Sequence, residues 1–152
     1  MREPEIFERG TVLGAIGGNA TKHLMILCNN PVEYTRFENS EKAVLTVNVT
    51  SWRDERPGWN DPACVLQEGD HPFIRHKSFV IYSFACISRA SIIQKKIQER
   101  EFQVREKLSS DVFFRVMDGF ERSDRTKMDI LRFIKMLKTA DQFEYLHLQT
   151  DR

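Results

Sequence analysis

The sequence has no excess of either charge and no long hydrophobic run. Its 152 residues include 23 Lys or Arg and 22 Asp or Glu, which gives a formal net charge of +1. Proteins that coat nucleic acid carry a large basic excess, so this balance confines any nucleic-acid site to a local patch. No stretch approaches the roughly 18 apolar residues of a spanning helix, and the charged start MREPEIFERG does not resemble a signal peptide. We expect a cytoplasmic protein with no membrane partner.

Cysteine is also scarce. Cys28, Cys64 and Cys86 are odd in number and widely spaced. This pattern fits neither a disulfide framework nor a zinc site built on CxxC pairs. We therefore expect reduced, mostly buried thiols, and we expect no metal or other cofactor.

The chain is long enough for one hydrophobic core, so we expect residues 1–152 to form a single domain. Up to about residue 90, short runs rich in Val, Ile, Leu, Phe and Thr alternate with turn-forming clusters. These runs are residues 10–16, 23–28, 43–50, 64–66, 78–83 and 85–88. Five or six short strands at this spacing predict a β-rich α+β fold with a small SH3-like antiparallel barrel over residues 10–88.

From residue 90 to 137 the pattern predicts a helical appendage. The stretch 91–107 is highly charged, and its isoleucines at positions 92, 93 and 97 predict a short helix. Residues 139–152 are expected to form a tail, either loosely ordered or docked onto the domain.

Two further helices are marked by their caps. Ser109 and Ser110 provide an N-cap for a helix that we expect to end at Gly119. Ser123 or Asp124 is expected to cap a second helix over residues 124–137.

The densest cluster of reactive side chains is the run GDHPFIRHKS, residues 69–78, which is predicted to join two strands. Histidine both donates and accepts protons near neutral pH, and cations beside it can hold a phosphate or stabilise its charge. The alternative is a polar turn in which the histidines only bond backbone groups. The candidates are His71 and His76 for proton transfer, Arg75 and Lys77 for phosphate binding, and Ser78 for positioning.

Polar side chains also mark the ends of two predicted strands. Lys22 and His23 open the strand over residues 23–28, and Thr50 and Ser51 close the strand over residues 43–50. Strand ends provide a rigid support for a site. We include Lys22, His23 and Thr50 among the catalytic candidates, although His23 and Thr50, each taken alone, are more often structural.

Aromatic and basic residues alternate in the next loop, at Trp52, Arg53, Arg56 and Trp59. Proteins bind single-stranded RNA in this way, by stacking on the bases and contacting the phosphates. The alternative is that the tryptophans fold onto the wall of the barrel.

A metal site was the third alternative for this region. Cys64, His71, His76 and His23 are donors that zinc accepts. Their spacing lacks the HExxH pattern on a helix, and no second cysteine pairs with Cys64. A lone cysteine before an apolar Val-Leu is more often buried and inert than a nucleophile.

The strand motifs resemble those of the MazF/PemK toxins. The matching runs are GTV at residues 10–12, KHLMIL at 22–27, VNVTS at 47–51 and SFV at 78–80. The runs DPACVL (61–66), GDHPFI (69–74), HKS (76–78) and GFERS (119–123) are similar to a divergent group of bacterial proteins with this barrel. The resemblance covers roughly residues 10–137.

The resemblance implies a function and several roles. MazF/PemK toxins cut single-stranded RNA without metal, use the 2'-hydroxyl as nucleophile, act as homodimers and pair with an antitoxin. By position, Lys22 stands at their catalytic arginine and Thr50 at the threonine that holds the scissile phosphate. His23 replaces their usual proline and Lys22 departs from their arginine, so histidine is expected to transfer the proton in this chain.

The sequence therefore predicts a toxin-type, metal-independent endoribonuclease in a toxin–antitoxin or phage-defence context. The alternative is a catalytically silent barrel that binds RNA or a partner protein, and the third possibility is the metal-dependent hydrolase.

Overall fold

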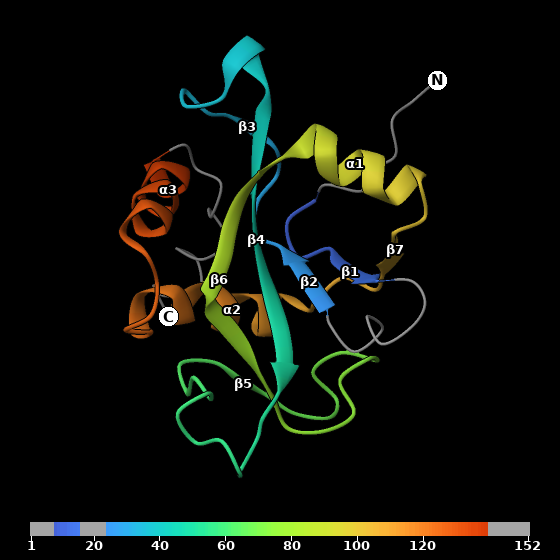
Figure 1. Cartoon of the computed structure of the whole chain (residues 1–152), viewed down its shortest axis with the longest axis vertical. Coiled ribbons are helices and arrows are strands. Elements are labelled where there is room, and N and C mark those ends of the chain that lie inside the picture. Colours follow the sequence, from blue (N-terminus) through green and yellow to red (C-terminus); the bar gives the residue numbers. More distant parts are fainter. Residues whose placement is uncertain (1–7, 16–23, 140–152) are drawn as a thin grey trace.

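The computed structural model describes residues 8–15 and 24–139 and has a mixed α+β architecture (Figure 1). Lys22, His23 and the tail from residue 140 onward lie outside the described residues. The strands are β1 (Val12–Ala15), β2 (Leu24–Leu27), β3 (Val32–Glu33), β4 (Lys42–Ser51), β5 (Val65–Leu66), β6 (Ser78–Arg89) and β7 (Phe102–Arg105). The helices are the short 3₁₀ helix η2 (Glu38–Ser40), α1 (Ala90–Gln98), α2 (Ser110–Arg122) and α3 (Met128–Thr139).

The strands form one strongly curled, antiparallel half-barrel sheet. Its order is β5-β6-β4-β2-β1-β7, and β3 pairs with the start of β4. The long strands β4 and β6 run side by side through the middle of the molecule (Figure 1). The prediction of a curled antiparallel sheet accompanied by helices is confirmed at this level of detail.

Strand β6 is continuous from Ser78 to Arg89, whereas the sequence predicted two strands, 78–83 and 85–88. The β4–β6 register shifts at this point, because Thr46 pairs with Cys86 and Asn48 pairs with Ile81. Val47 therefore faces the longer stretch 82–85, which forms a bulge. A bulge interrupts the alternation of buried and exposed residues, which is why one strand has the pattern of two.

Strand β7 was not predicted. Helix α1 ends at Gln98, and Arg100 adopts a positive φ of 62°, which reverses the chain. Helix α1 is the short helix predicted within the stretch 91–107. Residues 102–105 then pair with β1, so the sheet extends beyond residue 88. A four-residue strand among charged residues has too little apolar periodicity to be recognised locally.

The two C-terminal helices exist, with shifted bounds. The Ser109 hydroxyl accepts the N–H of Val112, which confirms the predicted N-cap of α2. Gly119 does not end α2, which continues to Arg122. Ser123 caps the C-terminus of α2 through its backbone N–H, instead of beginning the next helix, and α3 starts later than predicted, at Met128.

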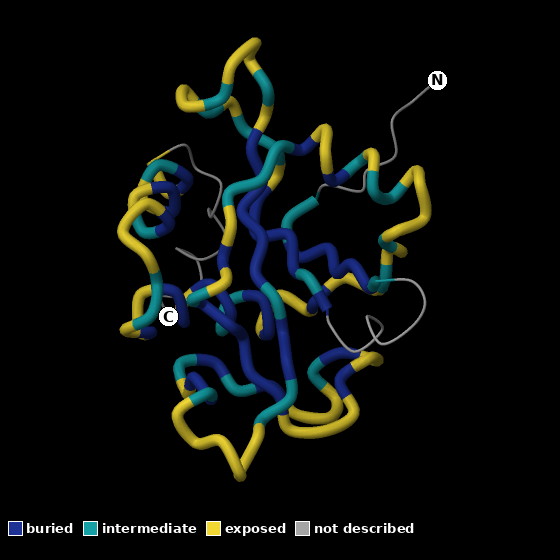
Figure 2. The backbone as a smooth tube through the Cα atoms, viewed as in Figure 1, coloured by how far each residue is buried: buried dark blue, intermediate teal, exposed yellow. Residues whose placement is uncertain are grey.

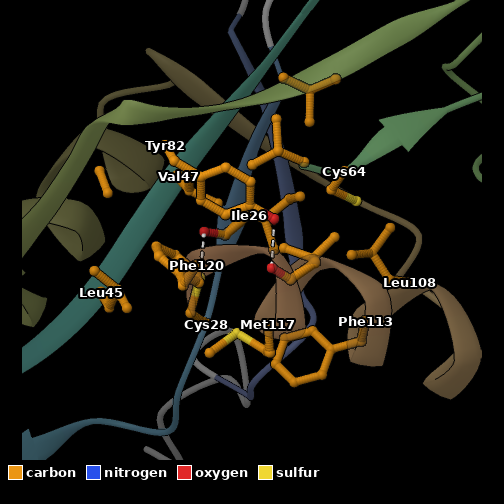
Figure 3. Packing of buried hydrophobic residues seen from close by; sticks show 14 of the residues in the cluster. Ile26, Cys28, Leu45, Val47, Cys64, Tyr82, Leu108, Phe113, Met117 and Phe120 are labelled. Carbon is orange, nitrogen blue, oxygen red and sulfur yellow. Dashed lines mark hydrogen bonds between the residues drawn. The ribbon is translucent and has the colours of Figure 1, made fainter. Parts of the chain in front are cut away.

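Hydrophobic side chains are buried on both faces of the sheet. Helices α2 and α3 cover one face with Val116, Phe120 and Phe133, which belong to the larger buried cluster. Figure 3 shows Phe120 of α2 within this cluster. Helix α1 covers part of the other face, where Ile93 packs in a smaller cluster with Val44. The buried residues follow β4 and β6 through the centre of the molecule (Figure 2). Among the described residues, no helix has the length and hydropathy of a membrane span.

Candidate functional site

A hollow of about 400 Å³ lies where β2 begins and β4 ends, opposite the loop that leads into β6. Ser51 at the end of β4 pairs with Ser78 at the start of β6, so antiparallel pairing brings the loop before Ser78 beside the end of β4. The polar residues that line the hollow are Thr50, Ser51, Arg53, Arg75, His76 and Ser78. Its apolar wall consists of Leu24, Val49, Phe73 and Ile74.

The closest polar contact in the hollow joins Ser51 and His76. The Ser51 Oγ and the His76 Nε2 lie 2.6 Å apart, although the residues are 25 positions apart in the sequence. His76 is exposed, and its Nδ1 makes no hydrogen bond with another described residue. The serine hydroxyl can donate to a neutral imidazole or accept from a protonated one, so the pair orients a histidine that remains accessible for proton transfer.

Among the described residues, two guanidinium groups and no carboxylate line this hollow. Arg75 is exposed and makes no hydrogen bond or ion pair with another described residue. Arg53 makes one long contact, 3.5 Å from its Nη1 to Glu55, and both side chains are more than half exposed. Such a surface pair contributes little energy, so both arginines are available to an anion.

The two predicted hydroxyls in the hollow have different roles. The Thr50 hydroxyl makes no hydrogen bond with another described residue, although Thr50 is 8% exposed. It is therefore available as a donor. Ser78 Oγ donates to the carbonyl of His76 at 2.9 Å, so its proton is already used to hold the turn that presents His76.

His71 does not share the environment of His76. It is 3% exposed, and both ring nitrogens are engaged. Its Nδ1 accepts the N–H of Phe73 at 3.1 Å, so the proton of the neutral ring resides on Nε2, which donates to the carbonyl of Glu106 at 2.6 Å. The structure therefore supports the alternative in which His71 belongs to a polar turn and only bonds backbone groups. His71 is not part of the candidate site.

The loop that carries Arg75 and His76 is anchored at further points. Asp70 forms an ion pair of 2.8 Å with Arg115 of α2 and accepts the N–H of Gln67. The guanidinium of Arg105 in β7 lies 4.3 Å from the ring centroid of Phe73. Together with the bond from His71 to Glu106, these contacts attach the loop to α2 and to the end of β7, two elements outside the hollow.

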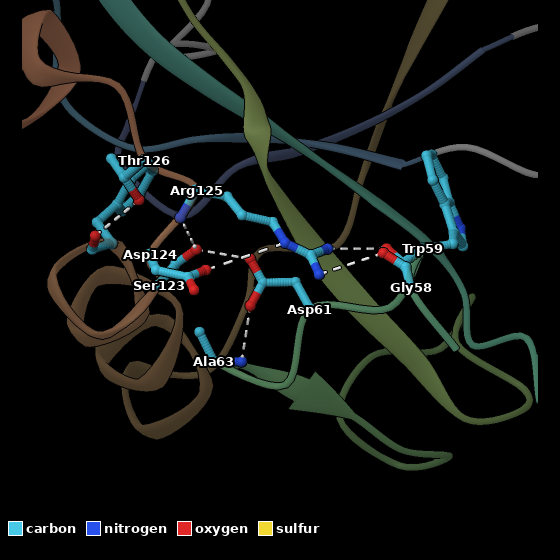
Figure 4. A network of polar contacts seen from close by, with 9 residues as sticks. Gly58, Trp59, Asp61, Ala63, Ser123, Asp124, Arg125 and Thr126 are labelled. Carbon is cyan, nitrogen blue, oxygen red and sulfur yellow. Dashed lines mark hydrogen bonds and ion pairs between the residues drawn. The ribbon is translucent and has the colours of Figure 1, made fainter. Parts of the chain in front are cut away.

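A second polar network holds the neighbouring loop of Trp52, Arg53, Arg56 and Trp59 (Figure 4). Arg125 donates to the carbonyls of Trp59 and Gly58 at 3.0 and 3.2 Å. The buried Asp61 accepts the Ser123 hydroxyl at 2.6 Å. These contacts attach the loop to the turn between α2 and α3, which explains why Ser123 does not cap α3.

Both tryptophans of this loop are half-buried. Trp52 packs edge-on against Phe79, and the Lys77 Nζ lies 4.0 Å from its ring centroid. Trp59 also packs against Phe79, and its Nε1–H is buried without a partner among the described residues. The wall-packing interpretation is thus correct for the position of both rings, while Arg56, Arg53 and Lys77 remain exposed.

The cysteines do not form part of the hollow. Cys64 is buried beside Tyr82, and burial raises the pKa of its thiol, which makes it a poor nucleophile. Across residues 8–15 and 24–139, no group of three or more His, Cys, Asp or Glu side chains is placed to hold a metal ion. The alternative of a metal site built from Cys64, His71 and His76 has no support in this part of the chain.

Comparison of the chain with family models, with curated proteins and with solved structures gives no match. The function must therefore be inferred from the hollow itself. Of the predicted residues, Thr50, Arg53, Arg75, His76 and Ser78 line it, and His71 does not. Sequence reasoning noted Ser51 at the strand end but missed its contact with His76, which the β4–β6 register would have revealed.

Proposed function

We propose that this hollow binds a phosphate group of single-stranded RNA and that the chain cleaves the RNA there without a metal ion. The supporting observation is the charge of the lining, whose described residues include two available arginines, a histidine fixed by Ser51 and no carboxylate. Cationic donors without a competing acid favour a phosphodiester over a neutral or cationic ligand. The curled sheet is compatible with a MazF/PemK-type barrel, and the proposal extends to that family's cytoplasmic homodimer and antitoxin.

The proposed step is an internal transfer within the RNA. The ribose 2'-oxygen attacks the adjacent phosphorus and loses its proton to a base, while the bond from phosphorus to the 5'-oxygen breaks and that oxygen takes a proton from an acid. The products are a 2',3'-cyclic phosphate and a free 5'-hydroxyl. His76 performs one of the two proton transfers, and Arg75, Arg53 and Thr50 stabilise the charge on the phosphate oxygens.

The second proton transfer is assigned to His23, which remains a prediction. His23 and Lys22 lie outside the described residues, but Leu24, the next residue in the sequence, lines the hollow. His71 takes no part in the proposed chemistry, because both of its nitrogens hold the loop.

The test is single-turnover cleavage of a fluorescent single-stranded RNA of mixed sequence, carried out in EDTA. The wild type should produce fragments that end in a cyclic phosphate, and His76→Ala should lower the rate roughly 100- to 10,000-fold, the usual contribution of a proton-transfer group. Arg132→Ala, on the exposed side of α3, is the control for a change in net charge and should cleave like the wild type.

The outcomes separate the alternatives. Cleavage that stops in EDTA and returns with a divalent metal would favour the metal-dependent hydrolase. RNA binding without cleavage would favour the silent barrel. Equal rates for the wild type and His76→Ala would exclude the proposed role of His76.

A further inference from the structure

Four aromatic rings form a continuous row beside the hollow. Phe84 packs against Trp59 with ring centroids 5.9 Å apart, and Trp59 packs against Phe79 at 6.0 Å. Phe79 in turn packs against Trp52 at 6.0 Å. The rings meet edge to face, so the row is a packed unit of the kind that aromatic quadrupoles favour.

Only one end of this row is well exposed. Phe79 is fully buried and both tryptophans are half-buried, whereas Phe84 is 55% exposed. Phe84 lies in the bulge of β6, where Val47 faces residues 82–85. A large apolar ring held at the surface by a rigid aromatic neighbour offers a face to a ligand.

Cations flank the row at both tryptophans. The guanidinium of Arg56 lies 5.4 Å from the centroid of Trp59, and the ammonium of Lys77 lies 4.0 Å from the centroid of Trp52. Two carboxylates lie in the same loop: Asp54 accepts the Nε1–H of Trp52 at 3.2 Å, and Glu55 lies 3.5 Å from Arg53. Aromatic faces next to cations are the combination that binds unpaired bases and their phosphates.

The Trp52 end of the aromatic row lies next to the residues that line the hollow. Trp52 follows Ser51, Lys77 follows His76, and the backbone N–H of Trp52 donates to the carbonyl of Lys77 at 3.0 Å. Phe79 pairs with Thr50 across the two strands. A single-stranded RNA with one phosphate in the hollow would therefore place its neighbouring nucleotides at the aromatic row.

We propose that this row is a base-stacking platform for single-stranded RNA and that Phe84 is the ring that contacts a base. The inference rests on the proposed function, because it places the nucleotides next to the phosphate in the hollow. It adds Phe84, which sequence reasoning did not single out, and it explains why Trp52 and Trp59 are held in place instead of being exposed.

The experiment compares two non-cleavable strands on the full chain. One is a fluorescein-labelled 2'-O-methyl strand of about ten uridines, and the other has the same length and phosphate number but lacks bases over its centre. The wild type should bind the strand with bases more tightly, and its intrinsic fluorescence should be quenched, because Trp52 and Trp59 are its only two tryptophans. Phe84→Ala should weaken binding of that strand roughly 5- to 100-fold and leave the abasic strand unchanged.

Two variants serve as controls. Phe84→Tyr keeps an aromatic face and should bind both strands like the wild type. Ile92→Ala removes another exposed apolar side chain, on α1, and should change neither affinity. Thermal unfolding of each variant verifies that it is folded.

Equal affinity of the wild type for the two strands, or an equal loss on both in Phe84→Ala, would overturn the platform while leaving the phosphate site standing. Binding of neither strand would contradict the platform and the proposed function together. If Phe84→Ala converts a dimer to a monomer in sedimentation and leaves RNA affinity unchanged, the ring belongs to an interface between copies and the inference is wrong.

Discussion

The hydroxyl of Tyr82 contacts the backbone of helix α2 directly beside Gly119. It donates to the carbonyl of Val116 at 2.6 Å, and a Cβ added to Gly119 would lie 1.9 Å from the Tyr82 oxygen. The glycine is thus the place where β6 and α2 approach closely, and it does not end the helix as the sequence suggested. Figure 3 shows Tyr82 among the buried residues between β6 and α2.

Replacement of Gly119 by alanine should destabilise the fold, even though alanine favours a helix by about 1 kcal/mol over glycine. The new methyl group would meet the fully buried Tyr82 ring, which cannot move without losing its hydrogen bond. Overpacking of this kind costs about 1–3 kcal/mol, so we expect a net loss in the free energy of unfolding measured in urea. Gly58→Ala is the matched control, because nothing lies within 4 Å of its added Cβ, and its stability should barely change.

His71 provides a second prediction. Asn at position 71 keeps an acceptor near the Nδ1 position for Phe73 but leaves the carbonyl of Glu106 unpaired. We expect His71→Asn to lower the free energy of unfolding by about 1 kcal/mol, the usual net contribution of one hydrogen bond, because Glu106 is exposed. Because His71 only holds the loop, the single-turnover cleavage rate of the folded variant should stay within about threefold of the wild type, far from the loss expected for a proton-transfer group. A loss as large as that of His76→Ala, with an unchanged fold, would return His71 to the catalytic set.

The contact between Ser51 and His76 could not be predicted from local sequence patterns. The strands at 24–27, 42–51 and 65–66 were found to within two residues, because their apolar runs are bounded by turn residues. The contacts of His76 with Ser51 and of His71 with Glu106 are tertiary, since Ser51 is 25 residues from His76 and Glu106 is 35 residues from His71. The composition of residues 69–78 predicted a loop with reactive side chains. Which of its two histidines remains accessible for proton transfer depends on how the strands pair.

The same limit applies to β7. Its four residues alternate weakly in hydrophobicity, and the strand exists because β1 offers an unpaired edge. The charged residues around it hide this weak strand pattern, whereas the isoleucines at positions 92, 93 and 97 mark the short helix α1, which ends at Gln98.

Replacement of Ser51 tests how His76 is positioned. Ser51→Ala removes the hydroxyl 2.6 Å from the His76 Nε2 and should lower the cleavage rate at saturating RNA by about tenfold, with little change in RNA affinity. Ser51→Thr keeps a hydroxyl on a strand that favours β-branched residues and should restore most of the rate. A Ser51→Ala variant that changes affinity and not rate would contradict this positioning role.

The two buried thiols, of Cys28 and Cys64, should lower the free energy of unfolding at alkaline pH. Burial raises the pKa of both Cys28 and Cys64 above the ordinary thiol value of about 8.5. Each thiol is therefore ionised in the unfolded chain before it is ionised in the folded one, so its stabilisation is complete below about pH 8.5 and declines as the pH rises toward the folded pKa. Each contributes a slope of up to about 1.4 kcal/mol per pH unit, measured as the free energy of unfolding in urea under reducing conditions.

The double variant Cys28→Ala/Cys64→Ala should show a flatter dependence between about pH 8.5 and 10. The wild type and the double variant both retain the exposed Cys86, so the comparison isolates the two buried thiols. Equal slopes for the wild type and the double variant would contradict the assignment.

The salt dependence of RNA binding tests the phosphate site in the hollow most directly. Binding of a non-cleavable single strand, titrated over a range of salt concentrations, reports how many phosphates the protein neutralises. Arg75→Ala should weaken binding and reduce the slope of log K against log salt by about 0.7, the value for one contact to a single strand. Arg132→Ala, with the same change in net charge on α3, should retain the wild-type slope. Equal slopes and affinities for Arg75→Ala and the wild type would contradict the assignment of a phosphate to this hollow.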